Sequence, residues 1–164
     1  MTSPITIRPS RKHEDEYLKK WLHEPGATKW FPMENDREID DAVKHWMSYI
    51  DVEACFTAEY NLMICGMANL YIPIYKKLAH QCLLSIIVGE AYRGKGVGKA
   101  LMSHLEEVAR KKFQIEFLHL EVYDGNPAKH LYEKMGYTMY GRWQKFIKED
   151  EGYADKILME KKLV

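Results

Sequence analysis

The chain has 164 residues, 46% of them apolar, and its 24 basic and 24 acidic side chains give a formal net charge of zero. This length and composition predict a single domain over residues 1–164 and exclude a disordered chain. No run of about 18 apolar residues could span a membrane, and the balanced charge lacks the basic surface of nucleic-acid-binding proteins. The three cysteines form no CxxC pair, so they predict no metal site and favour a reducing, cytoplasmic environment.

Hydrophobic spacing divides the first half of the chain into strands and helices. Apolar residues alternate where a strand is expected and recur every three or four residues where a helix is expected. Pro25-Gly26 breaks the first helix, and Asp36 has the residue type of an N-cap for the second. The expected elements are a strand at 5–8, a helix at 13–23, an aromatic loop at 27–35, a helix from 36, and strands at 55–59 and 63–73.

The second half begins with a continuous apolar run over residues 81–88, which is typical of a strand buried on both faces. A helix follows Gly94 and extends to Lys112, and a shorter helix lies between Pro127 and Gly136. Further strands are expected at 115–122, 138–147 and 154–163. The order β, α, α, β, β, β, α, β, α, β, β predicts a mixed sheet with helices on its faces.

A glycine-rich segment, Arg93-Gly94-Lys95-Gly96-Val97-Gly98-Lys99, connects the buried strand to the following helix. Glycines let the backbone approach a ligand closely, and the first N–H groups of a helix attract a phosphate. Arg93, Lys95 and Lys99 add positive charge. The segment therefore predicts a phosphate-binding loop.

Two other phosphate-binding motifs fit this loop less well. A Walker A loop needs GxxxxGK followed by Ser or Thr, whereas Gly98-Lys99 is followed by Ala100 and Arg93 stands at the first glycine position. A dinucleotide-binding motif needs GxGxxG, whereas the glycines here follow GxGxG. Because Glu116 lies 20 residues after Gly96, the dinucleotide alternative stays open.

The segment from Arg93 to Gly98 resembles the R/Q-x-x-G-x-G/A signature of the GNAT superfamily of acetyl-CoA-dependent N-acetyltransferases. A second motif, Asn126 followed by A-x-x-L-Y-E-K-M-G-Y over residues 128–137, is similar to the second half of that family. The resemblance covers residues 83–162. It implies an α/β (α+β) GNAT fold, with a central mixed, mostly antiparallel β-sheet of about seven strands flanked by about four helices.

The resemblance also implies acetyl-CoA as the acetyl donor. Backbone N–H groups of residues 93–99 would hold the coenzyme A pyrophosphate, and the strand edge before them would pair with the pantetheine arm. Asn126 would hydrogen-bond the donor, although Gly125 occupies the register in which the family more commonly has Asn. The implied cofactor-binding residues are Ile86, Ile87, Val88, Arg93, Gly94, Lys95, Gly96, Val97, Gly98, Lys99, Asn126 and Tyr132.

Acetylation of an amine needs two proton transfers, one from the amine and one to the departing thiolate. The resemblance places Tyr132 near the sulfur, so its hydroxyl is the candidate donor, while a packed core tyrosine is the alternative. The identity of the base stays open between four hypotheses. His80 has a suitable ordinary pKa, and Glu121 follows on the next strand. Glu90 lies on the loop beyond the strand and ranks lower, and a water relay needs no essential base.

Trp30, Phe31 and Glu34 are the candidate acceptor-binding residues, because aromatic faces and a carboxylate attract an amine. The alternative is that the two aromatic residues simply close the core. The resemblance implies direct transfer of the acetyl group, through a ternary complex, to a primary amine of a small molecule or a protein N-terminus. The alternatives are an acyl-CoA-binding sensor without catalysis and transfer of another acyl group. Acetyl-CoA and an amine are the expected partners, without metal, nucleic acid or membrane, and a homodimer is compatible with the family.

Overall fold

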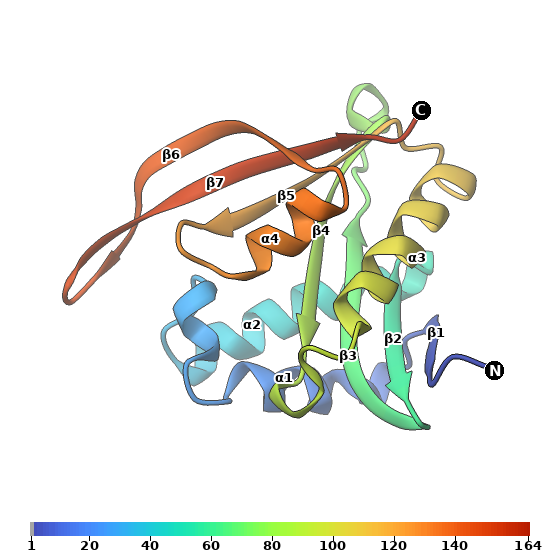
Figure 1. Ribbon diagram of the computed structural model, residues 1–164, viewed down its shortest axis with the longest axis horizontal. Helices are drawn as coiled ribbons and strands as arrows, with labels where there is room; N and C mark the ends of the chain where they lie inside the picture. The colour runs from blue at the N-terminus through green and yellow to red at the C-terminus, as the bar shows by residue number, and fades with distance from the viewer. Residues whose placement is uncertain (1) are drawn as a thin grey trace.

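The computed structural model describes residues 2–164, which form a seven-stranded sheet and four α-helices (Figure 1). The strands are β1 (Ile5–Pro9), β2 (Cys55–Tyr60), β3 (Met63–Tyr71), β4 (Gln81–Val88), β5 (Phe117–Tyr123), β6 (Thr138–Glu149) and β7 (Gly152–Lys162). The helices are α1 (Asp15–Leu22), α2 (Asp36–Met47), α3 (Val97–Lys111) and α4 (Ala128–Lys134). The predicted number and order of strands and α-helices are confirmed.

The strands lie in the order β1-β2-β3-β4-β5-β7-β6. Every neighbouring pair is antiparallel except the central pair, β4 and β5. These two strands run parallel because α3 returns the chain to the end of the sheet at which β4 begins. The sheet is therefore mixed and mostly antiparallel, as predicted. In Figure 1 the long β6–β7 hairpin extends to the left of the helices.

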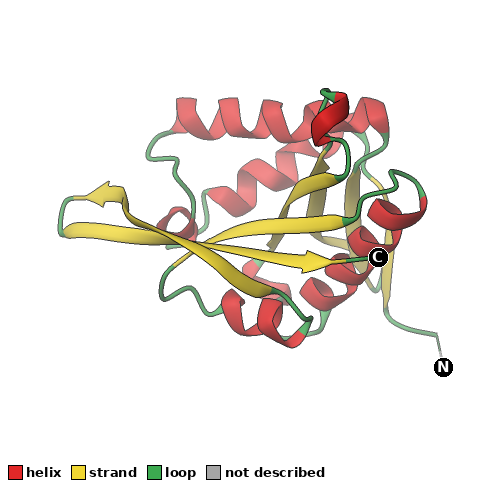
Figure 2. Ribbon diagram, turned by 90° about the horizontal axis from the view of Figure 1, so that it is seen from above, coloured by secondary structure: helices red, strands yellow, loops and turns green. Residues whose placement is uncertain are grey.

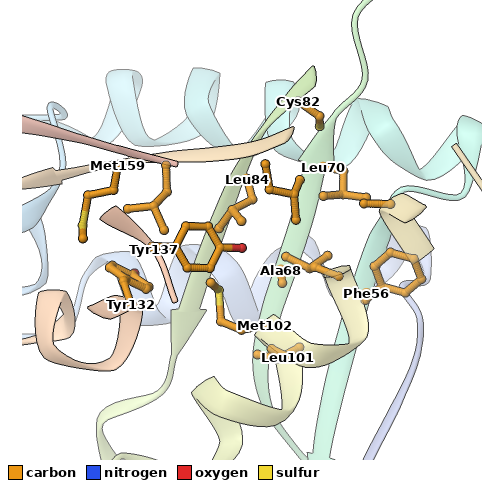
Figure 3. Packing of buried hydrophobic residues seen from close by; sticks show 14 of the residues in the cluster. Phe56, Ala68, Leu70, Cys82, Leu84, Leu101, Met102, Tyr132, Tyr137 and Met159 are labelled. Carbon is orange, nitrogen blue, oxygen red and sulfur yellow. The ribbon is translucent and has the colours of Figure 1, made fainter. Parts of the chain in front are cut away.

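Helices cover both faces of the sheet, and each face has its own apolar core (Figure 2). On one face, Leu101 and Met102 of α3 pack against Leu84 of β4, together with Tyr132 and Tyr137 (Figure 3). On the other face, α1 and α2 cover the sheet. This second cluster contains Leu18, Trp21, Leu22, Ile39, Val43, Trp46, Cys55, Met67 and Ile87. Because β4 contributes to both clusters, its continuous apolar sequence is explained.

The structure corrects three boundaries. Asn35, rather than Asp36, caps α2, because its side chain accepts the N–H of Glu38 at 3.0 Å. The expected loop at 27–35 starts with a 3₁₀ turn over Ala27–Trp30. The expected helix at 13–23 begins with a 3₁₀ turn over Lys12–Glu14, where the side chain of Glu14 is buried.

The three cysteines are free and buried within β2, β3 and β4. Among residues 2–164, no helix has the length and apolar character needed to cross a membrane.

Candidate active site

The central strands β4 and β5 separate part-way along their length. Their parallel pairing is confined to three rungs, the last of which joins Leu83 to His119. The pairing of β3 with β4 continues beyond this point to Val88. In Figure 1, β4 runs downward while β5 turns off to the left. From residue 84 to residue 88, β4 therefore pairs with β3 alone, and its other edge opens into the gap between the strands.

Backbone hydrogen bonding decides which groups face this open edge. The Gly89 N–H donates to the carbonyl oxygen of Cys65 at 2.9 Å, and residues of an antiparallel pair alternately face toward and away from the partner. Ile87 therefore directs its N–H and C=O groups toward β3, whereas Ile86 and Val88 direct theirs toward the gap. Of the three predicted strand residues, Ile87 instead contributes its side chain to the core under α1 and α2.

The glycine-rich loop lies at the end of this open edge. Gly94 and Gly96 adopt left-handed conformations, with φ of 74° and 85°, which glycine reaches without strain. No atom of the described chain lies within 4 Å of a Cβ built on Gly94, so this backbone is accessible to a ligand. Gly98 has a different role, because its Cβ would lie 3.2 Å from a methyl group of Leu131 in α4. Close helix packing thus accounts for the third glycine.

Helix α3 begins where the loop ends, and Gly96 supplies no side-chain cap. The first hydrogen bond of the helix joins the Ala100 N–H to the Gly96 carbonyl, so the N–H groups of residues 97–99 have no partner within the helix. Lys99 is exposed in this first turn, while the Lys95 ammonium lies 5.2 Å from the ring centre of Tyr60. The helix dipole and Lys99 make this end of α3 attractive to an anion.

Residues of α1 and of the turn after it hold the loop from the opposite face. The Glu24 carboxylate accepts the N–H of Glu90 at 3.1 Å and lies 3.7 Å from the Arg93 guanidinium. The Trp21 indole nitrogen would lie 2.6 Å from a Cβ on Gly89, so only glycine fits there. Sequence analysis missed the contacts of Trp21 and Glu24 with the loop, because the sequence shows only that both residues lie near the end of a helix.

Tyr132 lies on α4 and is almost fully buried beside Tyr137 in the core of Figure 3. The helix ends with N–H groups of Gly136 and Tyr137 donating to the carbonyl oxygens of Glu133 and Tyr132, each at 3.0 Å, which fixes the tyrosine pair. Burial raises the pKa of Tyr132 to about 12, so its hydroxyl stays protonated at neutral pH. Ile86 and Val88 pack against the same core cluster as Tyr132.

Asn126 lies in the turn between β5 and α4. Its side-chain oxygen accepts the N–H of Ala128 at 3.0 Å, so the amide NH₂ group is the part of this side chain left for a ligand. Gly125 adopts a φ of 88°, and the turn therefore requires a glycine-like backbone at that position.

The two predicted bases occupy different surroundings. Glu121 on β5 forms an ion pair with Lys156 of β7 at 2.6 Å, so its carboxylate is already engaged. His80 is exposed and precedes β4, at the end of the strand away from the glycine-rich loop. Its carbonyl oxygen accepts N–H groups of Glu116 and Phe117, which fixes the start of β5.

His80 borders a cavity of about 370 Å³ beside the paired ends of β4 and β5. Within it, His119 Nε2 lies 2.5 Å from the side-chain oxygen of Gln81. Burial lowers the pKa of His119 against the opposing charges of Glu121 and Glu160, which favours the neutral imidazole. Sequence analysis missed this cluster, although polar residues inside two apolar strands were a usable signal. The cavity is lined by His80, Gln81, Phe117, His119, Tyr140 and Glu160.

A buried polar side chain, Asn69, lies on the same face of the sheet as His119, the face away from α3. Asn69 of β3 is fully buried opposite Ser85 of β4. Its amide lies close to the Tyr71 hydroxyl, and the hydrogen bonds of that hydroxyl with Ser85 and Asn69 partly offset the rise in the Tyr71 pKa that burial causes.

The predicted acceptor residues follow α1. Phe31 packs against the core under α1 and α2. Trp30 is partly buried, and the ammonium of its neighbour Lys29 lies 4.9 Å from its ring centre. Glu34 is exposed and donates its backbone N–H to Glu38. The structure thus shows core packing for Phe31, while Trp30 and Glu34 remain accessible.

Known proteins similar to this chain are acetyltransferases. The model of the acetyltransferase (GNAT) family matches residues 11–137. L-amino acid N-acetyltransferase AaaT of Escherichia coli (strain K12) is 21% identical over 161 residues, covering 96% of this chain and 97% of that protein.

Solved structures share the fold. YncA of Salmonella typhimurium, solved with acetyl-CoA, superposes with a TM-score of 0.82 at 19% identity, covering 99% of this chain and 95% of that one. Spermidine N-acetyltransferase of Vibrio cholerae, solved with CoA and spermine, gives the same TM-score and identity over 99% and 97% of the two chains. With the family match over most of the sequence, these findings lead to one conclusion: the chain belongs to the acetyltransferase (GNAT) family and is an N-acetyltransferase.

Proposed function

We propose that this enzyme transfers the acetyl group of acetyl-CoA directly to a primary amine, within a ternary complex of enzyme, donor and acceptor. The separation of β4 from β5 after Leu83 and His119 carries the proposal. It leaves a free strand edge that leads from the glycine-rich loop toward a cavity on the face opposite α3. Donor and acceptor would therefore meet where the two strands part.

The free edge suits the donor. The pantetheine arm contains amide groups, which would pair with the N–H and C=O groups of Ile86 and with the N–H of Val88 in the manner of an added strand. The Val88 carbonyl already accepts a hydrogen bond from Arg93. The pyrophosphate would lie at the unpaired N–H groups of α3, beside the accessible Gly94 and Gly96.

Direct transfer is supported by the state of the cysteines. Cys82 is the cysteine of β4, and it is fully buried with its thiol donating to the Leu83 carbonyl. Burial raises its pKa to about 12, so it does not supply a thiolate at neutral pH. The pKa values of Cys55 and Cys65 are likewise raised, to about 12 and about 11. An acetyl-cysteine intermediate is therefore disfavoured, and the amine itself is the nucleophile.

Tyr132 would protonate the departing thiolate, since its raised pKa keeps the hydroxyl proton available across the working range of pH. The acceptor is proposed to be a small molecule or a protein N-terminus. The named activities of the relatives on L-amino acids and on spermidine support this choice of amines.

The test is thiol release from acetyl-CoA with spermidine, L-amino acids, an aminoglycoside and peptides of different N-termini. Release above the no-acceptor background with one class supports the proposal and identifies the acceptor. The paired measurement is the stability gained from acetyl-CoA, about 2.7 kcal/mol at a hundredfold excess over Kd. Stabilisation without thiol release from any amine would favour the sensor alternative and contradict the proposed transfer.

A further inference from the structure

His119 occupies the point where β4 and β5 part. It belongs to the last paired rung, opposite Leu83, and the open edge of β4 begins at the next residue. Its imidazole lies in the cavity of about 370 Å³ on the face away from α3. Resting on the proposed function, we propose that His119 is the catalytic base that accepts the proton of the acceptor amine as the acetyl group is transferred.

Distance along the strand supports this position. A strand rises about 3.3 Å per residue, so Leu83 lies roughly 16 Å from Val88 at the glycine-rich loop. An extended donor arm that starts at the loop and follows the edge of β4 thus ends near the Leu83–His119 rung. The cavity at that end is open to an acceptor, because His80 and Tyr140 at its border are exposed.

The hydrogen bond to Gln81 selects the reactive nitrogen. With the Gln81 amide in this orientation its oxygen accepts, which favours the tautomer of His119 that carries the proton on Nε2. In the neutral ring, Nδ1 is then unprotonated and available as a proton acceptor. Gln81 is thus a positioning residue, which holds the tautomer and orientation of the ring.

The groups around His119 come from each neighbouring element. Gln81 is on β4, Glu121 on β5, Glu160 on β7 and Tyr140 on β6, and His80 borders the cavity just before β4. Glu121 is neutralised by its ion pair with Lys156, which leaves the Glu160 carboxylate to attract an amine. Phe117 and Tyr140 add aromatic surface, which attracts the positive charge of a protonated amine. Burial lowers the pKa of His119 against the opposing charges of Glu121 and Glu160, and this direction favours the neutral ring.

The transfer step is balanced in atoms and electrons. An acceptor that binds as an ammonium ion first releases one proton to solvent. The lone pair of the resulting neutral amine attacks the acetyl carbonyl carbon, a C–N bond forms as the C=O π electrons move to oxygen, and the nitrogen becomes positively charged and acidic. Nδ1 of His119 takes one proton from this nitrogen. The C–S bond then breaks, and its electron pair leaves on sulfur, which receives the Tyr132 proton. His119 releases its proton to solvent and Tyr132 regains one, so the net products are an amide and a free thiol.

The experiment compares His119→Ala with wild type on whichever tested amine gives the highest kcat/KM. We expect kcat to fall by about 10²-fold, with the stabilisation by acetyl-CoA unchanged. Added imidazole should restore part of the lost activity, because the cavity left by the side chain can hold it. His80→Ala, tested with the same imidazole, separates the two histidines of the cavity. His13→Gln is the matched control, since His13 is exposed on the 3₁₀ turn before α1.

Two further measurements do not depend on the alanine variant. In the wild type, ¹⁵N spectra of the imidazole should show the proton on Nε2 and a pKa below the ordinary value of about 6.5. Gln81→Glu should raise the pKa of His119, because a carboxylate favours the charged ring. The acidic limb of kcat against pH should then move to higher pH, while ionisation of the amine itself stays unchanged.

The outcomes separate this inference from the proposed function. Wild type that releases no thiol with any amine contradicts both. If the wild type is active and His119→Ala keeps the same kcat and the same acidic limb of kcat against pH, the inference alone is overturned. It is also overturned if that acidic limb disappears in His80→Ala instead. A proton on Nδ1 in the ¹⁵N spectra also overturns the inference. So does a His119→Ala variant that loses both its activity and its acetyl-CoA binding and whose activity imidazole does not restore.

Discussion

The side chain of Arg93 folds back onto the strand that precedes it, and its Nε donates to the carbonyl oxygen of Val88 at 3.2 Å. The same guanidinium faces Glu24, which also accepts the Glu90 N–H. Arg93 thus links the end of β4 and the glycine-rich loop to the turn after α1. This engagement means that the backbone of the loop and Lys99, rather than the Arg93 side chain, are the groups most available to a phosphate.

Glu24 connects the glycine-rich loop with the segment that carries Trp30 and Phe31. If this loop binds the donor as proposed, removal of Glu24 should weaken donor binding. Glu24→Ala should raise KM for acetyl-CoA about tenfold, because a charge-assisted hydrogen bond and an ion pair are both lost. Glu24→Gln keeps a hydrogen-bond acceptor and should raise KM only about two- to threefold. Steady-state kinetics with varied acetyl-CoA measures both values. Glu16→Gln, an exposed change on α1, is the control, and equal KM values for all four proteins would contradict this role.

Gly96→Glu should abolish binding of acetyl-CoA. The substitution places a bulky carboxylate at the proposed pyrophosphate site, on a backbone with φ of 85° that side chains rarely adopt. Thermal unfolding with and without acetyl-CoA measures the effect. Gly152→Ala introduces a side chain at another positive φ, in the turn of the β6–β7 hairpin, and should keep the acetyl-CoA shift. A normal shift in Gly96→Glu would place the donor elsewhere.

Tyr132→Phe should lower kcat about 10²-fold if the hydroxyl protonates the thiolate. Acetyl-CoA affinity should change little, because only one oxygen is removed. Since the pKa of Tyr132 is raised to about 12, the wild type should show no alkaline loss of activity from this group below that pH. Tyr137→Phe removes a second buried hydroxyl from the same core and should leave kcat unchanged. Rapid-mixing measurement of the chemical step decides the matter, and equal rates would remove Tyr132 from the mechanism.

Glu14 should control stability toward acid. Burial alone would raise its pKa, but hydrogen bonds from Arg8, the Arg11 N–H and Thr57, with the charge of Arg8, outweigh burial and lower it. Since the folded pKa lies below the unfolded one, this stabilisation is present above pH about 4.3 and is lost as pH falls through the folded pKa. Glu14→Gln should therefore lower the free energy of unfolding by about 3 kcal/mol at pH 7.

Urea unfolding from pH 3 to pH 7 tests this expectation. The difference between wild type and Glu14→Gln should shrink toward the acid end, whereas Glu16→Gln, on the exposed face of α1, should match wild type throughout. A difference that stays constant with pH would mean that packing, rather than the ionised carboxylate, stabilises this site.

Local patterns determined the order of the strands and helices and the position of the glycine-rich loop. Period-two and period-3.6 spacing reflects which side chains a strand or helix buries, so it is visible in one sequence. Two motifs, around Gly96 and Tyr132, together indicate the family. Each can be read from the sequence because it depends only on residues that are close together in the chain. The sequence could not tell that Gly98 serves helix packing while Gly94 and Gly96 serve the loop, because that difference depends on Leu131 of another helix.

The meeting of β4 and β5 was decided only by the tertiary structure. Leu83 and His119 are far apart in the chain, and their pairing depends on how α3 returns the chain across the sheet. The same holds for the ion pair that engages Glu121 with Lys156 and for the contact of Glu24 with the loop. Contacts between distant segments leave no periodic signal, since each partner alone is an ordinary polar residue. The sequence therefore determined the position of the glycine-rich loop, and the packing of distant elements determined the surroundings in which, on the proposed function, an acceptor would react.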